Sequence, residues 1–148
     1  MQHPTAEVSP EAIIGNDVKI WHHTQVREKA VIGNETLLAK NVYIDKDVMI
    51  GTRCKIQNNC SIYHGTHIGD GVFIGPHCVL ANDLTPRAIN TDGSLKDEND
   101  WLEGKITIEK GASLGARVVV LPNVRIGKFA MVGAGSVVTR DIPDYGLV

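Results

Sequence analysis

The sequence lacks the features of several large classes of protein. No apolar run approaches the roughly 20 residues of a membrane-spanning helix, and the opening MQHPTAEVSPEA has neither the charged nor the apolar region of a signal peptide. The formal net charge is only −2, with acids and bases interspersed, so neither nucleic acid nor an anionic membrane is expected as a partner. We therefore expect a cytoplasmic protein, and the 148 residues suit a single domain.

Cysteine is also scarce. Cys54, Cys60 and Cys78 are odd in number and lack paired CxxC spacing, which argues against a disulfide scaffold and a cysteine-based metal site. Neither a GxGxxG placed between strand and helix nor a GxxxxGK[ST] occurs, so a Rossmann or P-loop nucleotide site is not expected.

What the sequence does have is a six-residue rhythm. Steps of six from Val8 meet an aliphatic residue each time as far as Leu80, and the same steps resume at Ile108 and continue to Val138. The residue after the aliphatic is often glycine, and the fourth residue after it is small or branched, which includes all three cysteines. Two inward positions per six residues, with glycine where the chain must bend sharply, predict short strands joined by tight turns. An amphipathic helix needs a spacing of about 3.6 instead. We predict an all-β solenoid over residues 1–148, with the cysteines as small buried hydrophobes.

The rhythm breaks over residues 82–107, which read NDLTPRAINTDGSLKDENDWLEGKIT. This segment has no aliphatic hexads, but it has Pro86, two glycines and a run of charges. A loop this long within a regular domain is usually functional, so we predict an extended loop with a role in the site.

The hexads, ending in SLGARVVVLPNVRIGKFAMVGAGSVVTRDIPDYG, resemble the hexapeptide-repeat acyltransferases. That resemblance implies a left-handed parallel β-helix with three hexads per coil, acetyl-CoA as co-substrate, and a homotrimer with active sites between subunits. The segments IWHHTQVREKAVIG, NVYIDKDVMIGTRCKIQNN, SIYHGTHIGDGVFIGP and ANDLTPR are similar to nucleotide-sugar N-acetyltransferases that act on 3-amino deoxysugars linked to UDP or dTDP, for bacterial surface polysaccharide or O-antigen. Chains of that family usually continue past DIPDYGLV, which leaves room for a missing C-terminal tail.

Three hexads per coil place residues 18 apart above one another at a spacing of roughly 4.8 Å. His64 then lies one coil below Asn82, where the chain leaves the solenoid. Acetyl transfer to an amine needs a neutral amine, a polarised thioester carbonyl and a route for one proton. We predict His64 as the base and Asn82 as the group that positions the amine, with Asp83 holding the imidazole or the sugar ammonium. The alternatives are that the departing thiolate takes the proton and that His64 is an ordinary turn residue.

The cofactor and the sugar are each assigned a set of residues. Small side chains allow close approach of a ligand to the backbone, and the resemblance implies that the amides of Gly115, Ala116, Gly133 and Ala134 bind the thioester and pantetheine, with Arg140 near the phosphates of CoA. The residues expected to bind the nucleotide sugar, mainly by resemblance, are His22, Arg27, Asn41, Gln57, Asn58, Tyr63 and Arg87.

Three other functions fit the same solenoid. One is O-acetylation of a sugar hydroxyl from the same cofactor. A second is a zinc enzyme of the γ carbonic anhydrase kind, but that site needs a close histidine pair and a distant third, and no histidine follows His77, so we predict no metal. The third is a non-enzymatic scaffold, which leaves the polar break and the glycine–alanine pairs without a reason.

Overall fold

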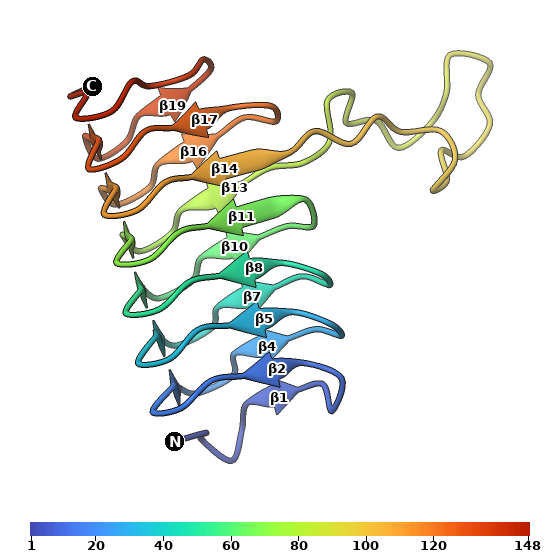
Figure 1. Ribbon diagram of the computed structural model, residues 1–148. Helices are drawn as coiled ribbons and strands as arrows, with labels where there is room; N and C mark the ends of the chain where they lie inside the picture. Colours follow the sequence, from blue (N-terminus) through green and yellow to red (C-terminus); the bar gives the residue numbers. More distant parts are fainter.

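The computed structural model describes residues 1–148, and its regular structure consists of short strands without a helix (Figure 1). The strands form three parallel sheets, and each coil of the chain contributes one strand to each sheet in turn. Sheet 1 contains β1 (Glu7–Val8), β4 (Gln25–Val26), β7 (Tyr43–Ile44), β10 (Ser61–Ile62), β13 (Val79–Leu80), β16 (Val119–Val120) and β19 (Val137–Val138). Sheet 2 contains β2 (Ile13–Ile14), β5 (Val31–Ile32), β8 (Met49–Ile50), β11 (Thr66–Ile68), β14 (Ile106–Ile108) and β17 (Arg125–Ile126). Sheet 3 contains β3 (Lys19–Ile20), β6 (Leu37–Leu38), β9 (Lys55–Ile56), β12 (Phe73–Ile74), β15 (Ser113–Leu114) and β18 (Met131–Val132).

This is the predicted all-β, left-handed parallel β-helix. Ser61 pairs with Val79 and Ile62 with Leu80, which confirms the 18-residue stacking. Beyond the break, Val79 pairs with Val119, so the solenoid resumes in register after the inserted segment.

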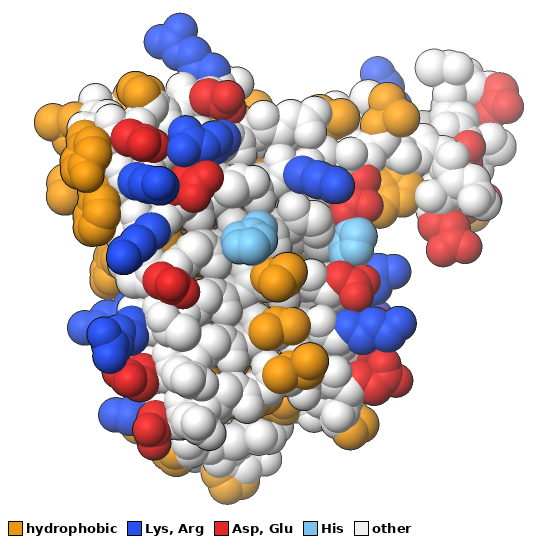
Figure 2. All heavy atoms as spheres, in the orientation of Figure 1, with side chains coloured by type: hydrophobic (Ala, Val, Ile, Leu, Met, Phe, Trp, Pro, Cys, Tyr) orange, Lys and Arg blue, Asp and Glu red, His pale blue; other side chains and the backbone are white.

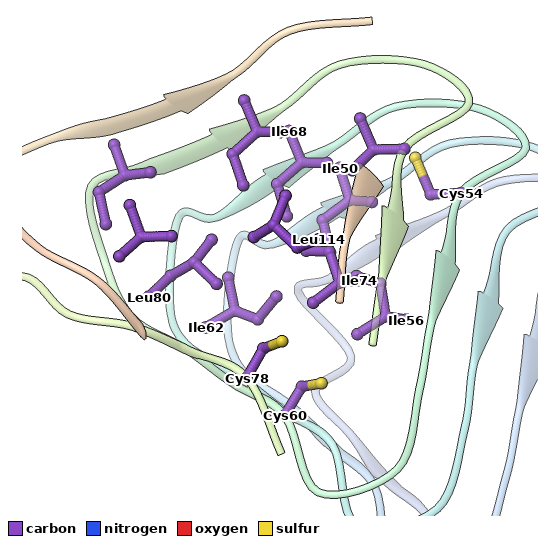
Figure 3. Close-up of a cluster of buried hydrophobic side chains, with 14 of the residues drawn as sticks. Ile50, Cys54, Ile56, Cys60, Ile62, Ile68, Ile74, Cys78, Leu80 and Leu114 are labelled. Atoms are coloured by element: carbon purple, nitrogen blue, oxygen red, sulfur yellow. The ribbon is translucent and has the colours of Figure 1, made fainter. Parts of the chain in front are cut away.

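The interior is a continuous column of mostly aliphatic side chains, a cluster of 31 buried residues. Figure 3 shows part of this cluster. The three cysteines are free and fully buried at its edge, as predicted. Each thiol also donates a hydrogen bond to a backbone carbonyl of the next coil: Cys54 to Gly69 at 3.1 Å, Cys60 to Gly75 at 3.0 Å and Cys78 to Gly115 at 3.1 Å.

The glycines that follow the inward aliphatics do not serve the bend, so that interpretation of the sequence was wrong. The left-handed residue of a corner comes two positions later and is often not glycine, as at Asn41 (φ 56°) and Asn59 (φ 62°). Glycine is required for another reason: a Cβ on Gly33 would lie 2.4 Å from the carbonyl carbon of Gly51 in the coil above. Successive coils approach too closely there for any side chain.

Three corners join the sheets. We call the one between sheets 3 and 1 the glycine–alanine corner, because it contains Gly115, Ala116, Gly133 and Ala134. The one between sheets 1 and 2 is the arm corner, since the inserted segment leaves the solenoid there, after β13 (Figure 1).

The inserted segment, residues 81–105, is an arm with two antiparallel legs. Asp83 bridges to Glu103 and Ile89 to Leu95, and the arm projects away from the solenoid (Figure 1). The Lys96 side chain is only 7% exposed and reaches across the arm to the Asp83 carboxylate at 3.7 Å. The arm ends earlier than the predicted boundary at residue 107, because Ile106 is buried and rejoins sheet 2 in β14.

Candidate functional site

His64 lies on the arm corner, between β10 and β11, at the base of the arm. The corner is sharp because Gly65 has a φ of 90°, in the region that favours glycine. The Asn82 amide Nδ2 donates to the His64 carbonyl oxygen at 3.2 Å, so the two residues are stacked as the sequence predicts. In this arrangement the Asn82 amide group is held by backbone of the coil below.

The His64 ring is flanked by two carboxylates and is 30% exposed. Nδ1 contacts the Glu103 carboxylate, which comes from the returning leg of the arm, and Nε2 lies 3.4 Å from Asp47 Oδ2 on the coil below. An imidazolium can donate to both carboxylates, whereas a neutral ring can donate to only one. The ring therefore has polar partners on both sides, whichever nitrogen exchanges a proton.

The carboxylates that contact this imidazole are those of Glu103 and Asp47, and not that of Asp83. The Asp83 carboxylate instead accepts a hydrogen bond from the Thr85 amide at 2.8 Å and faces Lys96 within the arm. The sequence analysis missed Glu103 because its contact with His64 depends on the two legs pairing. The sequence did contain one signal. An inserted segment that leaves the solenoid at a corner and rejoins it at the same corner must bring its first and last residues close together.

Two further residues of the arm corner were predicted to bind the nucleotide sugar. Arg27 is paired within its own chain, with Glu28 Oε1 at 2.6 Å and Asp45 Oδ1 at 3.4 Å. Tyr63 lies one coil above Asp45, with its ring tilted against that of Tyr43 at a centroid distance of 5.7 Å. Arg87 is exposed on the arm.

The glycine–alanine corner holds most of the remaining predicted residues in one ascending line. His22, Asn41, Gln57 and Asn58 lie on its lower coils, and the two glycine–alanine pairs lie on its upper coils. At the lower end, the His22 ring stacks on His3 with centroids 3.5 Å apart. Desolvation, followed by the positive charges of its neighbours His3, His23 and Lys40, lowers the pKa of His22, which favours a neutral ring near pH 7.

Two features of the backbone of this corner bear on ligand binding. A Cβ on Gly115 would lie 2.6 Å from the Ala134 nitrogen, so the glycine is required by the stacking of coils whatever it binds. The Ala116 and Ala134 amides, in contrast, have no acceptor within the chain. At some other corners the amide at this position is bound by an Asn or Asp of the coil above: Asn58 accepts from Lys40 at 3.1 Å, and Asp70 from Thr52 at 2.8 Å. Ala134 stands where such a side chain would bind the Ala116 amide.

Sheet 1 separates these two halves. Residues 117–121 cross it between the glycine–alanine corner and the arm corner, a span of roughly 13 Å at the rise of a β-strand. Reacting atoms must approach to about 3–3.5 Å for transfer. A single chain therefore does not bring His64 and Asn82 to the free amides. Arg140 is also on the arm corner, on the last coil, beside a groove of about 560 Å³ at the end of the solenoid.

No three His, Cys, Asp or Glu side chains lie close enough together to hold a metal ion. No helix is present that could cross a membrane. On the face shown in Figure 2, acidic and basic side chains are interleaved along the corners and do not form a surface of one sign.

The stacked hexads, which form three parallel sheets joined at three corners, define a hexapeptide-repeat β-helix protein. Residues 29–62, 47–82 and 105–140 match the family model described as bacterial transferase hexapeptide (six repeats), and the chain belongs to this family.

Two relatives match over shorter stretches. A galactoside O-acetyltransferase from Lactococcus lactis is 42% identical over 77 residues, 52% of this chain and 35% of the relative. A dTDP-3-amino-3,6-dideoxy-alpha-D-galactopyranose 3-N-acetyltransferase from Aneurinibacillus thermoaerophilus is 61% identical over 44 residues, 30% of this chain and 23% of the relative. The chain thus spans about a third or less of the length of these relatives. Among solved structures, a mutant of perosamine N-acetyltransferase from Caulobacter crescentus, in complex with CoA and GDP-perosamine, superposes with a TM-score of 0.52 at 25% identity, covering 99% of this chain and 50% of that one.

Proposed function

We propose that this protein is an acetyl-CoA-dependent N-acetyltransferase that acts on the amino group of a nucleotide-linked amino sugar, specifically a 3-amino deoxysugar carried by dTDP or UDP. The 61% identity to a dTDP-3-amino sugar acetyltransferase supports the acceptor. The structural likeness to an acetyltransferase crystallised with CoA and a nucleotide-linked sugar supports the pair of substrates. An N-acetylated sugar of this kind suits the assembly of bacterial surface polysaccharide or O-antigen, and both substrates are supplied in the cytoplasm.

The observation that carries the proposal is the pair of free amides at Ala116 and Ala134. They lie one above the other on adjacent coils and neither has an acceptor in the chain, whereas the amides of Lys40 and Thr52, at the same corner position, are bound by Asn and Asp side chains. Amides that are not buried and have no acceptor in the chain can donate to a bound molecule, and these two, stacked on adjacent coils, fit an extended ligand with acceptors at intervals. The amide groups of pantetheine have that character, and Gly133 beside them adds no side chain in the way.

The chemistry follows from the groups of the arm corner. The amine nitrogen of the sugar attacks the thioester carbon, the C–N bond forms, and the C–S bond breaks to release CoA. Asn82 positions the amine and His64 accepts the proton that the nitrogen loses, with Glu103 and Asp47 available to the protonated ring. The thiolate of CoA is the alternative acceptor. A His64→Ala enzyme with full turnover from about pH 6 to 9 would assign the proton to the thiolate.

A second copy of the chain completes the site in this proposal. We place the arm corner of one copy against the glycine–alanine corner of the next, a head-to-tail contact that closes into a ring, with three copies as the expected number. The outward-facing apolar residues of sheet 1 support this arrangement. Val79, Val119 and Val137 are stacked in register, and Val137 is 59% exposed. This face is therefore suited to packing against the other copies around the axis of the ring. The arm supports it too, because Leu95 at its tip is 81% exposed.

The test is thiol release from acetyl-CoA with a panel of UDP- and dTDP-linked 3-amino sugars, including uronate and 6-deoxy members, beside the matching 3-hydroxy sugars. We expect turnover with an amine acceptor and its loss in Asn82→Ala. The similarity to a galactoside O-acetyltransferase favours O-acetylation as the second candidate. Turnover with hydroxyl acceptors alone would establish that candidate and overturn the proposal.

A further inference from the structure

We infer that Asp45 is a positioning residue that fixes the backbone beneath His64, an inference that rests on the proposed function of that histidine. Asp45 is the only charged residue of the solenoid that is buried as a whole residue, at 9% exposure. It lies on the arm corner directly after β7, one coil below Tyr63 and His64. A carboxylate is costly to bury unless its oxygens accept hydrogen bonds, so the contacts of this one show what it holds in place.

Both oxygens of Asp45 are fully engaged. Oδ1 accepts from the Tyr43 hydroxyl at 3.0 Å and from the Lys46 amide at 2.8 Å, and Arg27 Nη1 lies 3.4 Å away on the coil below. Oδ2 accepts from the His64 amide at 3.0 Å on the coil above. One side chain thus joins three successive coils and ends on the backbone of the proposed base.

The His64 corner differs from the corners at Thr52 and Lys40 in how its backbone is held. At Thr52 and Lys40 the amide is bound by a side chain of the coil above, Asp70 or Asn58. At His64 the coil above offers Asn82, but that side chain donates to the His64 carbonyl instead. The amide therefore depends on Asp45 from below.

This arrangement sets the place of the imidazole. Asn82 holds the carbonyl of His64 from above and Asp45 holds its amide from below, so the Cα is fixed between two side chains. The ring is then directed between its charged neighbours, Asp47 on the coil below and Glu103 on the arm. Without Asp45 the amide has no partner, and the ring loses the alignment that transfer of a proton from the sugar amine requires.

The experiment compares Asp45→Asn with a matched control, Asp70→Asn. Asp70 also accepts from a corner amide, that of Thr52, but it lies at the corner between sheets 2 and 3, away from His64. We expect the turnover number of Asp45→Asn to fall about tenfold with an unchanged KM for acetyl-CoA, and that of Asp70→Asn to stay within about twofold of the wild type. Hydrogen exchange at the His64 amide, followed by NMR, should be faster in Asp45→Asn alone. If Asp45→Asn does not fold, Tyr43→Phe removes one donor to the carboxylate and should give a smaller loss in the same direction.

Two results would overturn the inference. One is unchanged exchange of the His64 amide in Asp45→Asn, which would mean that the carboxylate does not hold it. The other is faster exchange with turnover equal to that of Asp70→Asn, which would make Asp45 purely structural. A wild-type protein without activity on any amine would instead contradict the proposed function, and the exchange measurement would still decide whether Asp45 fixes His64.

Discussion

The close stacking of coils predicts different losses of stability at two glycines of the corner between sheets 2 and 3. Gly33 follows an inward aliphatic and has ordinary backbone angles, whereas Gly71 is the left-handed residue of its corner, with a φ of 66°. We expect Gly33→Ala to destabilise the protein far more than Gly71→Ala, although Gly71 has the unusual conformation.

The magnitudes follow from what each new methyl group would meet. On Gly33 the Cβ would lie 2.4 Å from the Gly51 carbonyl carbon and 2.6 Å from both the Gly51 oxygen and the Thr52 nitrogen. These are backbone atoms in a hydrogen-bonded ladder, so relief requires the coils to separate, and overpacking of this severity costs about 3 kcal/mol. On Gly71 the Cβ would meet nothing within 4 Å, which leaves the left-handed conformation alone, at about 1 kcal/mol.

Chemical unfolding followed by circular dichroism measures both variants against the wild type. Gly135→Ala is a matched control, since this glycine also has a positive φ, 77°, and open space around it. It should behave like Gly71→Ala. Equal losses for Gly33→Ala and Gly71→Ala, or a greater loss for the second, would refute the account of why glycine occurs after the inward aliphatics.

Three further predictions concern the core, the arm and the last coil. Cys54→Thr should change the free energy of unfolding by less than about 1 kcal/mol in denaturant titrations, because Thr36, one coil below, already places a hydroxyl in that slot and donates to the next coil at 2.8 Å. Lys96→Met should leave the melting temperature of the solenoid unchanged but speed chymotrypsin cleavage within the arm, since the Lys96 ammonium joins its two legs. For Asp144, a hydrogen bond from the Lys128 amide and then one from the Arg125 side chain lower the pKa of the carboxyl. The ionised Asp144 therefore stabilises the folded protein at pH values above the ordinary carboxyl pKa, and this stabilisation is lost as the pH falls through the lowered pKa. Melting curves of Asp144→Asn and the wild type should therefore differ at pH 7 and converge in acid.

The sequence was sufficient to predict the solenoid, its inward residues and its register as far as the break. Each of these follows from local periodicity, because the identity of one inward side chain constrains the residue stacked on it and little else. The position of Asn82 above His64 came from the same periodicity, and the structure has that contact.

The rest could not be predicted because it depends on contacts without periodicity. Glu103 reaches His64 only because the arm folds back on itself. Arg27 was expected to bind the nucleotide sugar, but its guanidinium is paired with Glu28 and Asp45, which spacing alone does not reveal. The free amide of Ala116 likewise becomes visible only when its acceptor is sought and Ala134 is found in the place of one.

The central claim is that the active site forms between two copies, from the arm corner of one and the glycine–alanine corner of the next. It is tested most directly by mixing two inactive variants, His64→Ala/Asn82→Ala, which disables the arm corner, and Ala134→Trp, which covers the free amides. Co-assembled in equal amounts, they should recover about one quarter of the wild-type activity, because random assembly leaves about one in four contacts with both intact halves. Mixed assemblies with no more activity than the two variants measured separately would contradict the account.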